Sequence, residues 1–133
     1  MTGDMFADTY RFMQLNIKIW LGDEKEHGFL GEGRYRLFRE IERTGSLAQA
    51  AEKLSLSYRK AWGDVRAVES RLGFQLVNRR RGGSLGGAST LNERGKKLLE
   101  AYGRIQSNLH KQAQRQFKQK LEPLLSQKKQ KNP

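Results

Sequence analysis

Residues 57–66 hold the densest set of side chains that could bind a ligand in this sequence. Ser57 can cap a helix, and Arg59 and Lys60 then stand in its first turn. Cations there oppose the helix dipole by roughly a few tenths of a kcal/mol each, and Gly63 within the helix costs about 1 kcal/mol relative to alanine. Two local misfits on one face indicate a functional constraint. Basic side chains at an electropositive helix start are typical of phosphate and base-edge binding.

Catalytic and metal-binding chemistry is not indicated by the residue types present. The sequence has no cysteine, and its two histidines, His27 and His110, lie far apart. It has no Ser/His/Asp set and no phosphate loop, because the glycine-rich segment 82–87 is not followed by Lys and Ser or Thr. The acidic residues Asp64 and Glu69 are expected to be solvated or paired. We therefore expect no enzyme activity, no metal and no cofactor.

The basic charge of the chain is unevenly distributed. The 133 residues carry a net charge of +12, with −3 in residues 1–33, +7 in residues 34–90 and +8 in residues 91–133. This balance favours a polyanionic partner, although a solvated basic surface or a ribosome-associated protein would also explain it. No apolar run approaches the roughly 20 residues of a membrane span, and no leader follows Met1. We expect a cytoplasmic, prokaryotic protein with no membrane partner.

The periodicity around residues 57–66 predicts three helices, of which the second and third are joined by a short turn. Apolar residues repeat three or four apart before Gly45, which suits a helix end. Ser46 and Gln49 have the spacing of a capping box, and Ser57 caps a third helix that ends at Gly73. Two helices with this connection predict a DNA-binding helix-turn-helix, with an ordinary αα-hairpin as the alternative.

The third helix has an apolar and a polar face. At about 100° per residue, the inner face holds Ala61, Val65, Val68 and Leu72. The outer face holds Arg59, Gly63, Arg66 and Ser70, with Lys60 and Ala67 beside them and with Tyr58 and Trp62 on a flank. We expect Arg59 and Lys60 to contact guanine or phosphate. We expect Trp62 to pack against the first helix or against the hairpin, called the wing, that follows the third helix.

A basic hairpin is predicted after the third helix. Residues 74–78 and 88–91 have the composition of short strands, and three arginines and the glycine-rich segment 82–87 separate them. Such a wing suits phosphate or minor-groove contact, whereas a flexible linker is the alternative. The residues expected to contact DNA are Ser46, Ser57, Tyr58, Arg59, Lys60, Gly63, Arg66, Arg79, Arg80, Arg81, Gly82 and Gly83.

The two ends of the chain have different patterns. Residues 1–12 predict a loose lead-in, and the alternation over 15–21 predicts a half-buried strand. Asn92 caps a last helix, which Pro123 limits, and residues 127–133 predict a disordered tail. An apolar seam on this helix predicts a homodimer and hence a palindromic operator, with packing on its own domain as the alternative. The seam consists of Leu98, Tyr102, Ile105 and Leu109.

These elements predict an α+β, mainly helical protein. Its architecture is a winged helix-turn-helix with an N-terminal strand and a long C-terminal dimerisation helix. We expect a lead-in and strand in residues 1–30, the DNA-binding domain in 31–91, the dimer helix in 92–125 and a basic tail in 126–133.

Residues 31–105 resemble the DNA-binding domain of molybdate-responsive regulators of the ModE type and, more distantly, the head domain of LysR-type regulators. The resemblance rests on segments 45–47, 50–51, 57–62 (Ser-Tyr-Arg-Lys-Ala-Trp), 77–79, the glycine pairs 82–83 and 86–87, and 91–95. Asn92 stands where the family usually has Thr, and Gln75 where Pro is common. The resemblance implies winged-helix DNA binding and dimerisation. The family's molybdate-binding region has no counterpart in this sequence, so a response to an effector would require a separate effector-sensing protein.

The sequence thus predicts a sequence-specific DNA-binding transcriptional regulator without an effector-binding domain of its own, whose partner is double-stranded DNA. Two alternatives remain open. One is a nonspecific nucleic-acid-binding protein of nucleoid or RNA type, and the other is an interaction module for a separate effector-sensing partner.

Overall fold

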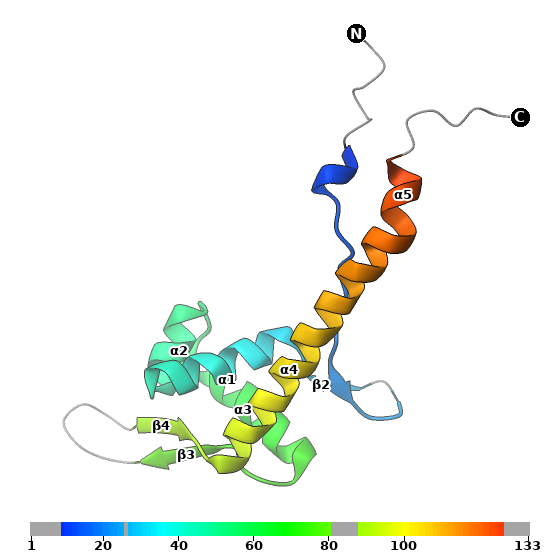
Figure 1. Ribbon diagram of the computed structural model, residues 1–133. Helices are drawn as coiled ribbons and strands as arrows, with labels where there is room; N and C mark the ends of the chain where they lie inside the picture. The colour runs from blue at the N-terminus through cyan, green and yellow to red at the C-terminus, as the bar shows by residue number, and fades with distance from the viewer. Residues whose placement is uncertain (1–8, 26, 81–87, 127–133) are drawn as a thin grey trace, which may run out of the picture. The chain divides into compact units, whose positions relative to one another are not determined.

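The computed structural model describes residues 9–25, 27–80 and 88–126, and within them the chain is mainly helical with two small antiparallel sheets (Figure 1). The elements in chain order are the 3-10 helix η1 (Thr9–Phe12), β1 (Leu21–Gly22), β2 (Gly28–Leu30), α1 (Glu32–Thr44), α2 (Leu47–Lys53), α3 (Tyr58–Leu72), β3 (Val77–Arg80), β4 (Ala88–Leu91), α4 (Glu93–Gln116), the π-helical segment η2 (Phe117–Leu121) and α5 (Glu122–Leu125). None of these helices is long and apolar enough to cross a membrane.

The chain divides into two compact units. One is Lys18–Gly103, and the other combines Met1–Ile17 with Arg104–Pro133. In the first unit, α1, α2 and α3 surround a mainly apolar core. The core residues contributed by these helices are Leu37, Phe38, Ile41, Leu47, Ala50, Ala51, Ala61, Val65 and Val68. The order of elements and the paired β3 and β4 confirm the expected winged helix-turn-helix.

Local caps set the ends of these helices, as the sequence predicted. Gly45 and Gly73 end α1 and α3 with φ of 71° and 82°, the left-handed region that favours glycine. At the start of α3, the Ser57 hydroxyl oxygen accepts a hydrogen bond from the Lys60 amide at 2.9 Å. The direction and first turn of α3 are therefore fixed by residues next to it in the chain.

The capping box predicted at the start of α2 forms only in part. The Ser46 hydroxyl oxygen accepts a bond from the Gln49 amide at 3.1 Å, as expected. The Ser46 amide donates instead to Thr44 Oγ1 at 3.2 Å, so the Thr44 hydroxyl takes the place foreseen for the Gln49 side chain. The sharp turn between α1 and α2 brings Thr44 close enough to do this.

The wing is an antiparallel hairpin, as predicted. Val77 lies opposite Leu91 and Arg80 opposite Ala88. The connecting residues 81–87 lie outside the described part of the chain, so the predicted contacts of Arg81, Gly82 and Gly83 fall outside it as well.

The first strand of the wing begins later than the predicted 74–78. The Glu69 carboxylate of α3 accepts hydrogen bonds from the amides of Leu76 at 2.7 Å and Val77 at 3.1 Å. A side chain of α3 therefore binds the backbone that would otherwise begin the ladder. This contact fastens the base of the wing to the helix expected to bind DNA.

The strand predicted over residues 15–21 is largely wrong. Only Leu21 and Gly22 join a ladder, with β2, while residues 13–20 form no helix or strand. The alternation still describes burial, because Leu15, Ile17 and Ile19 are half-buried and the residues between them are exposed.

Side chains of α4 take the place of a partner strand in this extended segment. The Tyr102 hydroxyl donates to the Ile19 carbonyl oxygen at 3.0 Å, and Gln114 Nε2 donates to the Leu15 carbonyl oxygen at 2.6 Å. The period of two records an extended backbone with one apolar side. It does not record what binds the backbone.

The long C-terminal helix begins as expected. Asn92 Oδ1 accepts a hydrogen bond from the Gly95 amide at 2.8 Å, which caps α4. Pro123 does not stop the helical path, because it lies in the first turn of α5, where a missing amide hydrogen costs little. Helical structure ends at Leu125.

Candidate nucleic-acid interface

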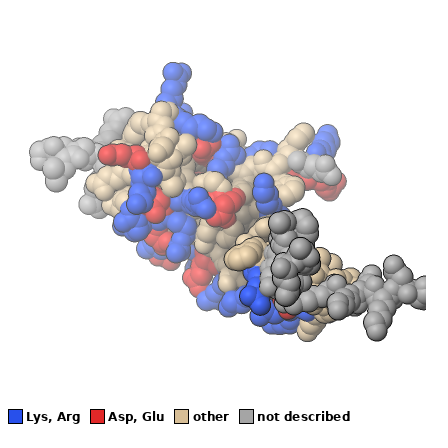
Figure 2. All heavy atoms as spheres, turned by 90° about the horizontal axis from the view of Figure 1, so that it is seen from above, with Lys and Arg blue, Asp and Glu red and all other residues tan. Residues whose placement is uncertain are grey.

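Helix α3 presents one apolar and one polar face, and the structure confirms which residues lie on each. Ala61, Val65 and Val68 are fully buried on the inner side. The outer side exposes Arg59, Lys60, Gly63, Arg66 and Ser70. Basic side chains with acidic ones among them are spread over the face shown in Figure 2. Basic charge alone therefore does not locate a binding surface, whereas the face of α3 has a defined shape and composition.

Gly63 leaves the backbone of this face uncovered. A Cβ built at Gly63 would meet no atom within 4 Å, and the residue's φ is not in the left-handed region. Neither packing nor backbone conformation within the described chain therefore requires glycine here. The open space is available to a partner that approaches the helix closely.

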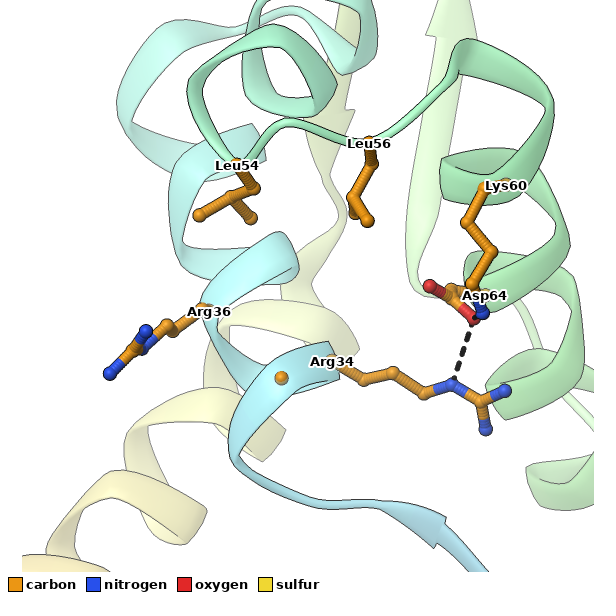
Figure 3. A pocket seen from close by; sticks show the side chains of 7 residues that line it. Arg34, Arg36, Leu54, Leu56, Lys60 and Asp64 are labelled. Atoms are coloured by element: carbon orange, nitrogen blue, oxygen red, sulfur yellow. Dashed lines mark hydrogen bonds and ion pairs between the residues drawn. The ribbon is translucent and has the colours of Figure 1, made fainter.

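The start of α3 lies beside two hollows that share a charged wall. One, of about 450 Å³, is lined by Arg34, Ser57, Arg59, Lys60, Gly63 and Asp64. The other, of about 350 Å³, is shown in Figure 3 and is lined by Gly33, Arg34, Arg36, Leu54, Leu56, Lys60 and Asp64. Basic groups of α1 and α3 thus converge at the start of the helix that was predicted to contact DNA.

The shared wall contains an ion-pair cluster that the sequence did not reveal in full. Asp64 is only 7% exposed, and its Oδ1 accepts hydrogen bonds from Lys60 Nζ at 2.8 Å and Arg34 Nε at 3.2 Å. Arg34 also donates through Nη1 to the Phe29 carbonyl oxygen at 2.8 Å. The spacing of Lys60 and Asp64 on one helix could have predicted their pairing. The contact from Arg34, thirty residues away, could not be predicted in this way.

Trp62 and Arg79 connect α3 to the wing. The Arg79 guanidinium carbon lies 3.4 Å from the centre of the Trp62 ring, and the Tyr58 ring meets Trp62 edge-on at 6.2 Å between centroids. The expected packing of Trp62 against the wing is confirmed. The N–H groups of a guanidinium lie in its own plane and point outward, so Arg79 above the Trp62 ring can still donate to a phosphate. For Arg80 only the strand position is described.

The other residues predicted to contact DNA lie at helix starts. Ser57 and Tyr58 are exposed at the start of α3, and Ser46 is half-buried at the start of α2. The oxygens of both serines already accept backbone amides, but each hydroxyl hydrogen can still donate.

The predicted dimer seam of α4 divides between core and surface. Tyr102 is only 8% exposed and belongs to the core of Lys18–Gly103, and Leu98 packs partly against the same core. Burial raises the pKa of the Tyr102 hydroxyl above its usual value. Tyr102, which the predicted dimer seam includes, packs with the neighbouring Leu99 against the core of its own domain.

The unit formed by the chain ends exposes a set of large apolar side chains. Ile105 is 54% exposed and Leu109 is 37% exposed, which keeps both available to a partner. Exposed apolar residues of the same unit are Phe12, Met13, Leu121, Leu124 and Leu125. Trp20, Leu21 and Tyr58 are exposed in the other unit, so most but not all of the exposed large apolar residues belong to this smaller one. Isolated exposed apolar residues are common, but a concentration of them in one small unit is typical of an interaction surface.

The helix-turn-helix segment is similar to known proteins. Residues 33–96 match the family described as "Bacterial regulatory helix-turn-helix protein, lysR family". The chain is 38% identical over 88 residues to the molybdenum-pterin-binding protein MopB of Rhodobacter capsulatus, covering 66% of this chain and 33% of MopB. It is 35% identical over 74 residues to the transcriptional regulator ModE of Haemophilus influenzae, covering 56% of this chain and 29% of ModE. The chain thus spans about a third of the length of these relatives.

A solved structure shares the fold. The DNA-binding domain of CbnR, crystallised as a DNA complex, superposes with a TM-score of 0.50 at 24% sequence identity, covering 62% of this chain and 90% of that domain. At this identity the likeness concerns the fold.

Proposed function

We propose that this protein is a sequence-specific DNA-binding transcriptional regulator. The premise is that residues 33–96, which match the LysR family of bacterial regulatory helix-turn-helix proteins, form a DNA-binding domain of ModE type. One observation carries the proposal. The outer face of α3 exposes Arg59, Lys60, Gly63 and Arg66, whereas Ala61, Val65 and Val68 on the inner face are fully buried. A helix with an anchored inner side and a basic, uncovered outer side fits the major groove of DNA.

Each group on this face has a distinct proposed role. Arg59, in the first turn of α3, reaches a base edge and pairs with guanine O6 and N7. Lys60 and Arg66 bind phosphates, and Gly63 lets the helix backbone approach the groove floor closely. The hydroxyls of Ser46, Ser57 and Tyr58 donate to phosphate. The contacts to phosphates position the helix, and the contacts to base edges select the sequence.

The wing supplies the second set of contacts. Arg79, held against Trp62, meets a phosphate beside the groove that α3 occupies. Arg80 contacts phosphate or the adjacent minor groove, and the same contact is proposed for Arg81, Gly82 and Gly83, which lie outside the described residues. Because phosphate contacts carry no sequence information, the wing raises affinity for all DNA alike.

Dimerisation gives the protein a palindromic operator. The exposed apolar residues of Met1–Ile17 and Arg104–Pro133, Ile105 and Leu109 among them, pack against a second copy. Two-fold symmetry then presents two α3 helices to half-sites one helical turn, or a multiple of it, apart. Replacing Ile105 with aspartate should shift the protein toward monomer in light scattering, whereas a variant that remains dimeric would place the interface elsewhere.

Selection of bound duplexes from a randomised DNA pool tests the proposal. The wild-type protein should enrich a palindromic sequence and prefer it over random duplex of equal length by about a thousandfold or more. A ratio near one would overturn the proposal and favour nonspecific nucleic-acid binding. If the protein makes 6–10 phosphate contacts, affinity should fall about 10³- to 10⁵-fold between 50 and 200 mM salt.

Arg59→Ala tests where the sequence is read. This variant should lose about 1–3 kcal/mol of operator binding and relax the preference at one or two base pairs, because a bidentate contact to guanine is removed. Arg115→Ala, which removes the same charge from an exposed position on α4, is the matched control and should keep the base preference. Full discrimination by the Arg59 variant would show that bases are read by other residues.

A further inference from the structure

We propose that Asp64 and Arg34 are positioning residues that control whether Lys60 can bind DNA. In this proposal, Asp64 competes with a DNA phosphate for Lys60, and Arg34 makes the exchange possible by remaining on Asp64 after Lys60 has left. The inference rests on the proposed function. It adds a residue outside α3, Arg34 of α1, whose effect on DNA binding is exerted through Lys60.

The three side chains converge on one oxygen atom. Lys60 Nζ and Arg34 Nε both bind Asp64 Oδ1, so two cations share one carboxylate oxygen. Figure 3 shows Arg34 reaching from α1 and Lys60 descending along α3 to the same group. The cluster therefore carries one cation more than Asp64 needs.

The two cations are held unequally. The Lys60 side chain is 59% exposed, and Asp64 is its single partner among the described residues. The Arg34 side chain is 30% exposed and also donates to the Phe29 carbonyl oxygen. An ammonium group on a flexible, solvated stem is the easier group to release. Lys60 is therefore the exchangeable partner, and Arg34 is the fixed one.

Burial of Asp64 explains why Arg34 must stay. The Asp64 side chain is only 10% exposed, and leaving a buried carboxylate without a cation is strongly unfavourable. When a phosphate takes Lys60, the carboxylate retains Arg34 and its charge remains compensated. Without Arg34, Lys60 becomes the single compensating cation in the cluster and is held on Asp64.

The test is the salt dependence of DNA binding by the full chain, measured with the selected duplex and with a random duplex. Each phosphate neutralised contributes about 0.9 to the slope of log affinity against log salt. Arg34→Gln should reduce the slope by about 0.9 on both duplexes, because Lys60 stays on Asp64. Asp64→Asn should bind about two- to fivefold more tightly at fixed salt with an unchanged slope, because the competing anion is gone.

The double variant Arg34→Gln with Asp64→Asn distinguishes this mechanism from direct DNA contact by Arg34. We expect the double variant to recover the wild-type slope, since nothing then retains Lys60. If Arg34 binds phosphate itself, the slope stays reduced in the double variant, and the proposal is overturned. Lys60→Ala provides the matched background, in which adding Arg34→Gln should change the slope no further.

Two measurements distinguish a specific effect on DNA binding from misfolding of a variant. Thermal unfolding of each variant shows whether a weakened variant is still folded. Arg34→Lys keeps a cation next to Asp64 and should retain the wild-type slope, whereas a slope reduced as in Arg34→Gln would contradict the mechanism. If Asp64→Asn does not fold, the Lys60→Ala background still decides, because a phosphate contact made by Arg34 itself would be lost there when Arg34→Gln is added.

The proposed function and the role of Asp64 and Arg34 can be refuted separately. A wild-type protein without sequence preference overturns the proposed function. A selective wild-type protein with a steep salt slope, whose Arg34→Gln variant keeps that slope, overturns only the role of Asp64 and Arg34.

Discussion

Replacing Gly63 with alanine should raise the stability of the fold and lower its affinity for DNA. In the described chain a Cβ at this position meets no atom within 4 Å, so the new methyl group has room. The residue lies inside α3 and its φ is not left-handed, so alanine fits the backbone. The change therefore isolates the effect of a methyl group on the outer face of the recognition helix.

The expected gain in stability follows from helix propensity. Alanine is favoured over glycine within a helix by about 1 kcal/mol, chiefly because glycine loses more backbone entropy on folding. For a domain of roughly 60–100 residues, 1 kcal/mol raises the midpoint of thermal unfolding by about 4–8 °C. Circular dichroism at fixed protein concentration measures this shift.

The expected loss of DNA affinity follows from the same methyl group. If the Gly63 backbone contacts the floor of the major groove, a Cβ overpacks the interface, at a typical cost of about 1–3 kcal/mol. That cost corresponds to a roughly 5- to 150-fold increase in the dissociation constant for the operator. Fluorescence anisotropy with a labelled operator at one salt concentration measures it, and random duplex should be affected less because α3 is seated less deeply there.

Gly33→Ala is the matched control for this experiment. Gly33 lies in the first turn of α1, is exposed, and also has no atom within 4 Å of a built Cβ. Gly33 lines one of the two hollows but does not lie on α3, so its replacement should lower operator affinity much less than Gly63→Ala does. A Gly63→Ala protein that is more stable and binds the operator as tightly as the wild type would refute close approach of the α3 backbone to DNA, while a less stable one would refute the account of the open space.

Three further predictions concern the fold around the interface. Gly95→Ala should lower the midpoint of thermal unfolding by an amount corresponding to about 1–3 kcal/mol, because the added Cβ would lie 2.6 Å from a backbone oxygen just before β3; an unchanged midpoint would show that α4 can shift. The pKa of Asp23 is lowered from 3.8, foremost by the hydrogen bond from the His27 amide, so its carboxylate stabilises the fold above about pH 3.8 and this contribution is lost as the pH falls below that value. Urea unfolding should therefore show Asp23→Asn less stable than the wild type at pH 6, with the difference narrowing below pH 3.8, and a difference independent of pH would contradict this. Arg79→Lys keeps the charge but loses the contact of the guanidinium with the Trp62 ring. The free energy of unfolding should fall by about 0.5–1 kcal/mol. This loss should disappear in a Trp62→Leu background if the contact is its cause.

The faces of α3 could be predicted because they depend on residues close together in the chain. The helix repeat places Ala61 and Val65 on one side and Arg59 and Gly63 on the other wherever the helix packs. The serine and glycine caps likewise involve atoms three or four residues apart. The resemblance to winged-helix regulators rested on the same local segments.

The tertiary structure decided which groups those faces and segments meet. Arg34 reaches Asp64 from another helix, Glu69 delays the start of the wing, and the Tyr102 hydroxyl binds an extended segment 83 residues earlier in the chain. A sequence pattern fixes the side of an element on which a residue lies, because backbone geometry repeats. It does not specify the partner across the core, because that depends on how elements distant in the chain pack together.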